Sequence, residues 1–591
     1  LGICLILTAA FMLLASFVQS DFGRLDVANV WFTNSSGRRI RAKLFRPPGA
    51  TAREPAPGVV FVHGYQSTRE SNDAYCIEMA RRGIAVLSID ALGRGNSELP
   101  GDLDDPGFDR SFGARAAYHE LRGMPFVRSE RIGLMGHSLG GEVVYRLARD
   151  EPDVRALVVI GFAYDSTVSY DLPPNMLMIF GRWDEFRGRM TGTTSFMDEW
   201  MATSRTRRAI EHPEPQFGVT YGDFTTGTAR RVVAPHTIHV LENHHHGSVA
   251  EALRWIQRAL EPDPQAWLDP EHQVWHVKDW ATLGALIAGL ATILPLALLL
   301  LATSWFAPLI RSPRGRYACS PRTFAGAAAL NAVLMWLYLP ISLILFAVHA
   351  YVVPLDHVLP MMVVNCVAVW FVVINLVGTA CMWRWYCRRQ GELGISLDEL
   401  GVGVDGPTFG KSVALGAVLF LGVYAVEHVL ENLLLVDMRF VFSFANDLTP
   451  FRWLMVALYA PMLFVGFVGT GYLLYGQLRL RVDTSFARTL LRWSLVHIAT
   501  LVLPLLMLLA VQYVPLLLAD RVVLAGPGDM LALLTINVFH IVGVLILLLP
   551  LSAALYLLTG RPYVGATVSA LIVAWMFASS QVIAPVPIAT G

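Results

Sequence analysis

Charged side chains are scarce in this sequence of 591 residues. Lysine, arginine, aspartate and glutamate make up 16% of it, and mean hydropathy is +0.49, whereas a soluble protein carries about 25% charged residues. The deficit lies in residues 280–591, which hold 16 basic and 12 acidic residues against 30 and 34 in residues 21–279. A single soluble globule is therefore excluded, and the chain divides into a part suited to water and a part suited to lipid.

The sequence also has no net charge and few cysteines. The 46 basic and 46 acidic side chains cancel, and no basic block stands out, so nucleic acid is excluded as an expected partner. Cys76 is the single cysteine of residues 21–279. This part therefore cannot close a disulfide of its own, and no CxxC pair indicates a metal or redox site.

Long apolar stretches, by contrast, are abundant. Residues 1–20 carry no charge and are long enough to cross a hydrocarbon core of about 30 Å. We expect a retained transmembrane anchor preceded by further residues, since no methionine begins the sequence; a cleavable signal peptide ending near Ala15 and Ser20 is the alternative. Eight more stretches predict an all-α polytopic membrane domain over residues 280–591, at roughly 280–304, 324–353, 357–383, 412–436, 452–476, 493–517, 530–558 and 563–585.

The basic residues between these stretches alternate in number. One set of loops and span ends carries Arg311, Arg314, Arg316, Arg322, Arg384, Arg388, Arg389, Lys411, Arg479, Arg481, Arg488, Arg492 and Arg561, and the other set carries Arg439, Arg452 and Arg521. Basic residues concentrate in the cytoplasmic loops of membrane proteins. We therefore expect the first set to be cytoplasmic, and residues 21–279 and the C-terminus to lie outside the cytoplasm.

Residues 21–279 alternate short β-branched runs with amphipathic helical stretches. Continuous apolar runs of about five residues, separated by helix-length segments, indicate strands of a parallel sheet that is buried on both faces. These residues are enough for one α/β domain with a substantial core. The runs are 58–62, 84–89, 132–135, 156–160 and 176–180.

One of these runs leads into Gly136-His137-Ser138-Leu139-Gly140, which opens a helical stretch. A GxSxG sequence is common by itself. Between a strand and a helix it is typical of a nucleophile elbow, where small residues permit the strained turn that exposes the serine hydroxyl. We therefore predict that Ser138 is a nucleophile; a glycine-rich turn with a buried serine is the alternative.

A serine nucleophile needs a base and an orienting acid, expected in the order Ser, Asp/Glu, His. Asp184 follows the last apolar run, at the sheet edge where parallel sheets place their sites; Glu185 and Asp165 are the alternatives. We prefer His239 as the base over His246, because a helix N-terminus disfavours the imidazolium that the mechanism forms. The other histidines here are His236, His244 and His245, and we expect the run of three to lie in a solvated loop rather than at a metal.

The oxyanion of such a reaction needs two backbone N–H donors. Leu139, directly after the nucleophile, offers one, and Tyr65, in the turn after residues 58–62, offers the other. This chemistry requires no metal and no organic cofactor.

Five motifs follow one another in this part of the chain: VVFVHGYQS (59–67), SIDALGRGNS (88–97), GLMGHSLGG (133–141), IFGRWDEF (179–186) and IHVLENHHHGSVAEALRWI (238–256). In this order they resemble the α/β-hydrolase superfamily, and more narrowly its dienelactone hydrolase-like and acyl-peptidase-like members. Those families place an oxyanion HG turn, a D-x-x-G-x-G-x-S loop, the elbow, a G-x-x-D acid and a terminal histidine in this order. The resemblance implies the α/β-hydrolase fold and a Ser-His-Asp triad, without specifying a substrate.

Two features depart from that pattern. The nucleophile is serine, where true dienelactone hydrolases have cysteine, and the 55-residue step from Asp184 to His239 is longer than usual. We expect the excess, residues 187–229, to form a cap over the site.

The predicted membrane domain contains polar residues that are costly there, since a charged group costs about 2.5–3.5 kcal/mol on insertion scales. Glu427, His428, Glu431 and His540 fall in the outer halves of two predicted spans and form a candidate intramembrane polar site. Glu427 and Glu431 are four residues apart and share one helix face. The group could hydrogen-bond between helices, line an outward cavity for an amphipathic substrate or product, or form a metal or proton site.

The sequence therefore predicts a serine hydrolase integrated in the plasma membrane, with its hydrolase domain on the extracytoplasmic side. It would cleave an ester, thioester or amide bond of a small-molecule or lipid-like acyl substrate, with membrane lipids as its surroundings. The rival interpretation is a transporter or receptor whose hydrolase-fold domain is accessory or catalytically silent. The oligomeric state is left open.

Overall fold

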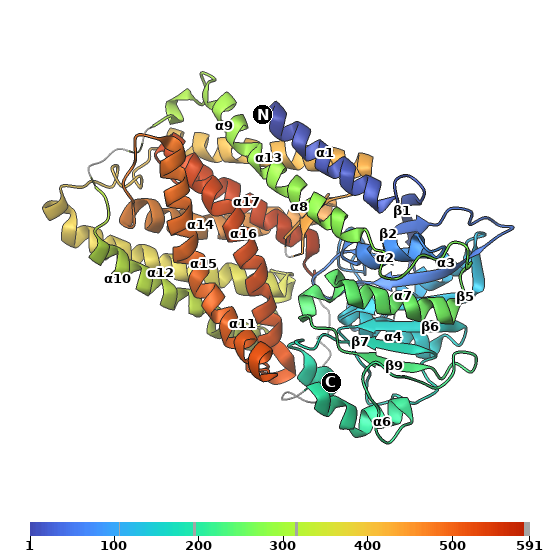
Figure 1. Cartoon of the computed structure of the whole chain (residues 1–591). Coiled ribbons are helices and arrows are strands. Elements are labelled where there is room, and N and C mark those ends of the chain that lie inside the picture. Colours follow the sequence, from blue (N-terminus) through green and yellow to red (C-terminus); the bar gives the residue numbers. More distant parts are fainter. Residues whose placement is uncertain (106, 193–196, 312, 314–316, 442, 584–591) are drawn as a thin grey trace.

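The computed structural model describes residues 1–583 except 106, 193–196, 312, 314–316 and 442. Arg314 and Arg316 of the predicted cytoplasmic set therefore lie outside the described residues. The chain forms a mixed α/β domain followed by a bundle of long helices, and the first helix, α1 (Gly2–Gln19), lies along the bundle (Figure 1).

A nine-stranded sheet forms the centre of the α/β domain, in the order β1-β2-β4-β3-β5-β6-β7-β9-β8. The strands from β4 to β9 run parallel, whereas β1, β2 and β8 pair antiparallel at the two edges. All five predicted apolar runs lie in strands of the parallel part, so the prediction of a parallel sheet is confirmed. The strands are β1 (Asp26–Thr33), β2 (Arg39–Arg46), β3 (Ala56–Val62), β4 (Ala85–Ile89), β5 (Val127–His137), β6 (Val154–Ile160), β7 (Met176–Ile179), β8 (Thr220–Tyr221) and β9 (Arg230–Val233).

Helices cover both faces of the sheet, which explains why the central strands contain continuous apolar runs. One core layer packs α3 (Ala114–Gly123) and α4 (Leu139–Asp150) against the sheet, and the other packs α2 (Asp73–Ala80) and α7 (His246–Leu260). β3 is buried at all of its seven positions, as expected for a parallel strand enclosed by helices.

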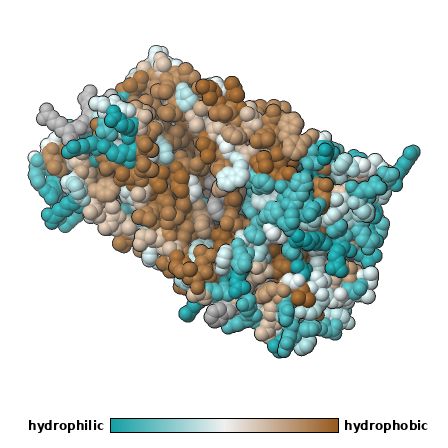
Figure 2. All heavy atoms as spheres, in the orientation of Figure 1, coloured by the Kyte–Doolittle hydropathy of each residue, from teal (hydrophilic) through white to brown (hydrophobic). Residues whose placement is uncertain are grey.

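Among the described residues, nine helices are long and apolar enough to cross a membrane by length and composition, which is compatible with a multi-pass membrane protein. Figure 2 shows hydrophobic residues gathered over this bundle, between hydrophilic residues on the α/β domain and at the opposite end. The nine are α1, α8–α9 (Trp275–Leu301), α10–α11 (Pro321–Tyr351), α12 (Met362–Leu393), α13 (Gly406–Leu434), α14 with a following π turn (Pro450–Gln477), α15 (Phe486–Ala519), α16 (Met530–Thr559) and α17 (Tyr563–Ser580).

The connections at the far end of the bundle contact one another. Arg311, between α9 and α10, bonds Asp398, which lies between α12 and α13. Arg561, between α16 and α17, donates to the Gly403 carbonyl at 3.0 Å. These arginine-bearing connections therefore gather at one end, away from the α/β domain (Figure 1).

At the near end, a buried network of charged side chains joins the α/β domain to the helices. Arg69, just before α2, pairs with Glu70 at 2.7 Å and lies 4.0 Å from Glu431 of α13. Arg439 of β10 (Met438–Phe440) lies 3.5 Å from Glu70 and donates to Thr68 Oγ1 at 2.9 Å. The network also includes Lys43, Asp73, Asp90, Lys278 and Asp437.

Candidate active site

The turn between β5 and α4 is strained at Ser138, whose φ is 54° and ψ is −119°. The residues around the serine are small because the chain passes close to itself. A Cβ atom at Gly136 would lie 2.2 Å from the Gly140 carbonyl oxygen, and one at Gly140 would lie 2.1 Å from the Val62 carbonyl oxygen. Glycine is therefore required at both positions, and the strained backbone presents the Ser138 hydroxyl above the C-terminal edge of the sheet.

Three side chains predicted from the sequence meet at this edge. His239 Nε2 lies 2.9 Å from Ser138 Oγ, and His239 Nδ1 lies 2.6 Å from Asp184 Oδ2. Asp184 is fully buried, and its other oxygen accepts the Phe186 N–H at 2.7 Å. The carboxylate is therefore fixed on both sides and holds the imidazole with Nε2 toward the hydroxyl, as the acid of a Ser-His-Asp arrangement does.

The electrostatics of His239 favour proton uptake. Burial alone would lower the pKa of His239, but the charge and hydrogen bond of Asp184, together with the nearby Glu185, raise it above 6.5. Glu185 is itself fully buried, and burial and the adjacent Asp184 raise its pKa to about 7. Its Oε1 accepts the Tyr513 hydroxyl of α15 at 2.7 Å, so the helical bundle reaches the residue next to the acid.

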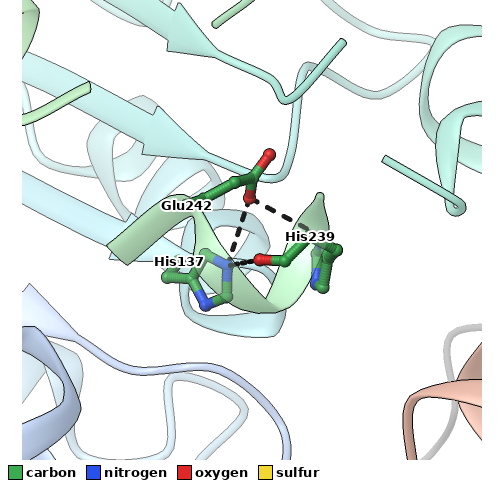
Figure 3. A group of neighbouring side chains, drawn as sticks. All are labelled: His137, His239 and Glu242. Atoms are coloured by element: carbon green, nitrogen blue, oxygen red, sulfur yellow. Dashed lines mark hydrogen bonds and ion pairs between the residues drawn. The ribbon is translucent and has the colours of Figure 1, made fainter. Parts of the chain in front are cut away.

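A second buried carboxyl group, that of Glu242, lies beside His137 and His239 (Figure 3). The sequence motifs did not predict that Glu242 belongs to the site. Its Oε1 accepts the Gly181 N–H at 2.6 Å, and its Oε2 lies 3.2 Å from His137 Nε2 and 3.7 Å from His239 Nδ1. Burial and Asp184 raise the pKa of Glu242 well above its usual value. Glu242 follows His239 by three residues, which places both side chains on one helical turn. This spacing is the sequence feature that could have indicated its position.

His137, His239 and Glu242 have atoms spaced closely enough to hold a metal ion. However, His239 Nδ1 already bonds Asp184 at 2.6 Å, and Glu242 already accepts a backbone N–H. An ion there would draw His239 away from its hydroxyl and carboxylate partners. We interpret the group as a hydrogen-bond network that fixes the helical turn η3 (His239–His244) below the serine.

The predicted oxyanion donors lie on either side of Ser138. Leu139 is the first residue of α4, so its N–H has no acceptor within the helix. The HG turn that carries Tyr65 approaches the elbow closely, since a Cβ at Gly64 would lie 3.3 Å from Ser138 Cβ. The Tyr65 N–H shares its peptide unit with the Gly64 carbonyl, which lies 2.8 Å from His63 Nδ1, so the N–H points away from His63.

The residue before this turn, His63, stabilises the loop that follows β4. Its Nδ1 lies 2.8 Å from the Gly64 carbonyl, and its Nε2 accepts the Ala91 N–H at 3.1 Å. Burial lowers the pKa of His63 to about 4. The ring is therefore neutral near pH 7 and can accept that bond.

The remaining acid and base candidates have other partners. Asp165 accepts the Thr167 N–H at 2.8 Å near the surface, and His246 bonds the Glu271 carbonyl at 3.0 Å at the start of α7. The run of three histidines is not a solvated loop throughout, because His244 bonds Asp279 at 2.6 Å and His245 caps α7 by accepting the Ser248 N–H. His236 packs against Trp183.

A cavity of about 100 Å³ lies over Ser138, between the α/β domain and the helical bundle. Its floor is formed by Ser138, His239 and the HG turn, and its other wall by Val441, Phe444 of β11 (Ser443–Ala445) and three residues of α16, Leu533, Ile536 and His540. The described residues of segment 187–229 contribute nothing to this lining. There, Trp200 packs against Phe180 and donates to Tyr164 Oη at 2.8 Å.

The candidate intramembrane residues are divided between two places. On α13, Glu431 accepts the Asp447 N–H at 2.5 Å, His428 lies 2.9 Å from Asp447 Oδ1, and Glu427 is fully buried beside them. His540 instead lies on α16 and lines the cavity over Ser138. Glu431 and His428 thus anchor the connection that leads to α14, whereas His540 belongs to the candidate active site.

Comparisons with known proteins agree with this architecture. Residues 53–209, less than half of the chain, match the family described as serine aminopeptidase, S33. No curated protein matches the chain.

Solved structures that resemble part of the chain include several hydrolases. The α/β hydrolase GrgF from Penicillium sp. sh18 is 14% identical over 40% of this chain and 100% of its own, with a TM-score of 0.28. An esterase from Pyrococcus furiosus is 14% identical over 41% of this chain and 96% of its own, with a TM-score of 0.29. A hypothetical protein from Pseudomonas aeruginosa is 21% identical over 30% of this chain, which spans 50% of that protein, with a TM-score of 0.22.

The predicted fold class is confirmed. The family match covers the HG turn, the elbow and Asp184, and the parallel sheet carries them at one edge. The chain contains a domain with the α/β-hydrolase fold, followed by a helical region with several long apolar helices.

Proposed function

We propose that the chain is a membrane-integrated serine hydrolase that cleaves an ester, thioester or amide bond on the extracytoplasmic side. The observation that carries the proposal is the unbroken series of contacts Ser138–His239–Asp184, with distances of 2.9 and 2.6 Å. The order of these residues along the chain is the one that α/β hydrolases use.

In the proposed mechanism, Ser138 Oγ attacks the acyl carbonyl while His239 Nε2 takes its proton. The carbonyl oxygen becomes an oxyanion, to which the Leu139 and Tyr65 N–H groups donate. The imidazolium, held by Asp184, then gives the proton to the leaving group, and an acyl-serine forms. Water, deprotonated by the same imidazole, releases the acid and restores the hydroxyl.

Integration in a membrane is supported by the nine apolar helices of the described residues. The extracytoplasmic side is supported by the distribution of arginine, because the arginine-bearing connections meet at the end of the bundle that is remote from the hydrolase domain. Basic loops remain in the cytoplasm.

A lipid-like or membrane-delivered acyl substrate is supported by the cavity wall. Phe444, Leu533 and Ile536 come from the helical region and present apolar side chains to the serine. Because this wall is apolar, we favour an acyl substrate with an apolar chain over a free peptide.

The nucleophile can be tested with a fluorophosphonate probe on the full chain in detergent. Wild type and Ser129→Ala, a control at an exposed serine on the same strand β5, should be labelled, and Ser138→Ala should not. His239→Ala should lose labelling and His246→Ala should keep it. Folded wild type that is not labelled would favour the rival, a transporter or receptor with a silent hydrolase-fold domain.

The orientation can be tested separately with a membrane-impermeant maleimide on intact cells. Cys387 is exposed at the end of α12, and in the proposed orientation it faces the cytoplasm and does not react. A cysteine introduced by Ser36→Cys, at an exposed turn of the hydrolase domain, should react without permeabilisation. The reverse pattern would place the hydrolase domain in the cytoplasm.

A further inference from the structure

The cavity over Ser138 has a neighbour inside the helical bundle, and one residue lines both. His540 of α16 lines the serine cavity of about 100 Å³ and also a second cavity of about 40 Å³. The two spaces therefore share one wall residue, whose imidazole ring packs near Phe444 with ring centroids 6.2 Å apart.

Helix α16 forms a continuous wall of the two cavities. Leu533, Ile536 and His540 face the first, and His540, Ile541, Val544 and Leu545 face the second. These positions follow the three- and four-residue steps of one helix face. At a rise of 1.5 Å per residue, the stripe is about 18 Å long, slightly more than half of a hydrocarbon core of about 30 Å. Its length therefore matches that of one acyl chain of a membrane lipid.

The second cavity is apolar apart from His540. The other residues that line it are hydrophobic and come from α10, α12, α14, α15, α16 and α17, with Trp370, Leu463 and Val573 among them. An apolar cavity stays dry and accepts apolar ligands. Since a water-sized group needs about 10–15 Å³ on this measure, the two cavities together hold roughly ten methylene groups.

We propose that the second cavity is the binding site for the distal part of the substrate's acyl chain, in a chain of about ten carbons or more. The inference rests on the proposed hydrolase function and deepens it. The carbonyl carbon lies at Ser138, the first methylenes fill the serine cavity, and the chain follows α16 past His540 into the bundle. The helical region thus determines which acyl-chain lengths bind, while the α/β domain cleaves the ester, thioester or amide bond.

The assignment explains why α16 contributes to the hydrophobic cores of both the hydrolase domain and the bundle. Ala532 and Ile536 of α16 pack within the hydrophobic core of the α/β domain, whereas Val544 and Leu545 belong to the core of the bundle. An acyl chain that lies along this helix passes from one core to the other without crossing water, so its methylene groups stay buried along the whole path.

Chain-length preference of the full-length protein in detergent tests the proposal. Val544→Phe should fill the second cavity and lower the ratio of kcat/KM for a dodecanoyl ester to that for a butanoyl ester at least tenfold. Ile546→Phe is the matched control, because Ile546 lies on the same helix and is 44% exposed on the outside. It should leave the ratio within twofold of wild type. An unchanged ratio in folded, probe-labelled Val544→Phe would overturn the acyl-chain site.

A second measurement needs no variant. A decyl fluorophosphonate with a photoreactive diazirine at the chain end is bound to wild type, irradiated, and mapped by mass spectrometry. We expect cross-links to peptides of α12, α14 or α16 that line the second cavity. Cross-links confined to the hydrolase domain, or to detergent, would overturn the acyl-chain site while the phosphonate on Ser138 upholds the hydrolase. No phosphonate on Ser138 would refute the proposed function itself.

Discussion

Replacing Gly140 with alanine should separate the nucleophile from its base. A Cβ at this position would lie 2.1 Å from the Val62 carbonyl oxygen and 2.5 Å from the His63 carbonyl oxygen, whereas ordinary contacts begin at 3.4 Å. Both neighbours are backbone atoms at the end of β3, so they cannot turn aside as a flexible side chain can. The start of α4 must therefore move by about 1 Å, and Ser138 moves with it.

The consequence follows from the 2.9 Å contact between Ser138 Oγ and His239 Nε2. Lengthened by about 1 Å, it is no longer a hydrogen bond, and a misplacement of that size costs about 10²-fold in rate. Overpacking should also cost about 1–3 kcal/mol of stability. We expect Gly140→Ala to fold with a Tm lowered by several degrees and to lose at least 99% of its ester hydrolysis.

The assay combines initial rates on a butanoyl ester, the rate of fluorophosphonate labelling and thermal unfolding of the purified protein. Gly123→Ala is the control, because a Cβ at Gly123, in the last turn of α3, meets nothing within 4 Å. It should keep the wild-type rate and gain slightly in stability, since alanine favours helix over glycine by about 0.5–1 kcal/mol. Wild-type rates in a stable Gly140→Ala protein would refute the reasoning.

Three further outcomes are expected. Asp184→Asn should lower kcat about 10⁴-fold with the fold intact, because an amide cannot hold the Nδ1–H tautomer; circular dichroism and ester hydrolysis measure both. Because the base acts as neutral imidazole and Asp184 and Glu185 raise the pKa of His239 against its burial, kcat/KM should rise with pH through a midpoint above 6.5. A midpoint below 6.5 contradicts this assignment. Arg439→Gln, which removes the ion pair of the buried Asp437, should destabilise the protein by about 3–5 kcal/mol in thermal unfolding, whereas Arg24→Gln, at an exposed arginine, should leave the Tm unchanged.

Much of the fold could be predicted because local patterns carry it. The apolar runs that became β3 to β7 are enclosed on both faces, so each is apolar throughout and visible without long-range information. The apolar stretches that became the nine long helices are equally local signals. Ser138 could be located because its strained turn demands glycine on either side.

The rest depended on packing between distant segments. Glu242 carries no motif, and its position beside His239 depends on a short helical turn where the sequence suggested a loop. Leu533 and Ile536 lie roughly 400 residues after Ser138 in the sequence, and nothing near them indicates that they line the cavity over this serine. His540 could be singled out as a polar residue in an apolar segment. Its position beside the cavity over Ser138 could not be predicted, because that position depends on how the helices pack.

The buried network of charged side chains that joins the α/β domain to the helices has a consequence for biogenesis. Arg69 and Glu70 are made early in translation, whereas Glu431 and Arg439, which complete their surroundings, are made more than 350 residues later. A buried ion lacking its counter-ion is strongly unfavourable. The buried charged network therefore takes its final form only after Glu431 and Arg439 have been synthesised.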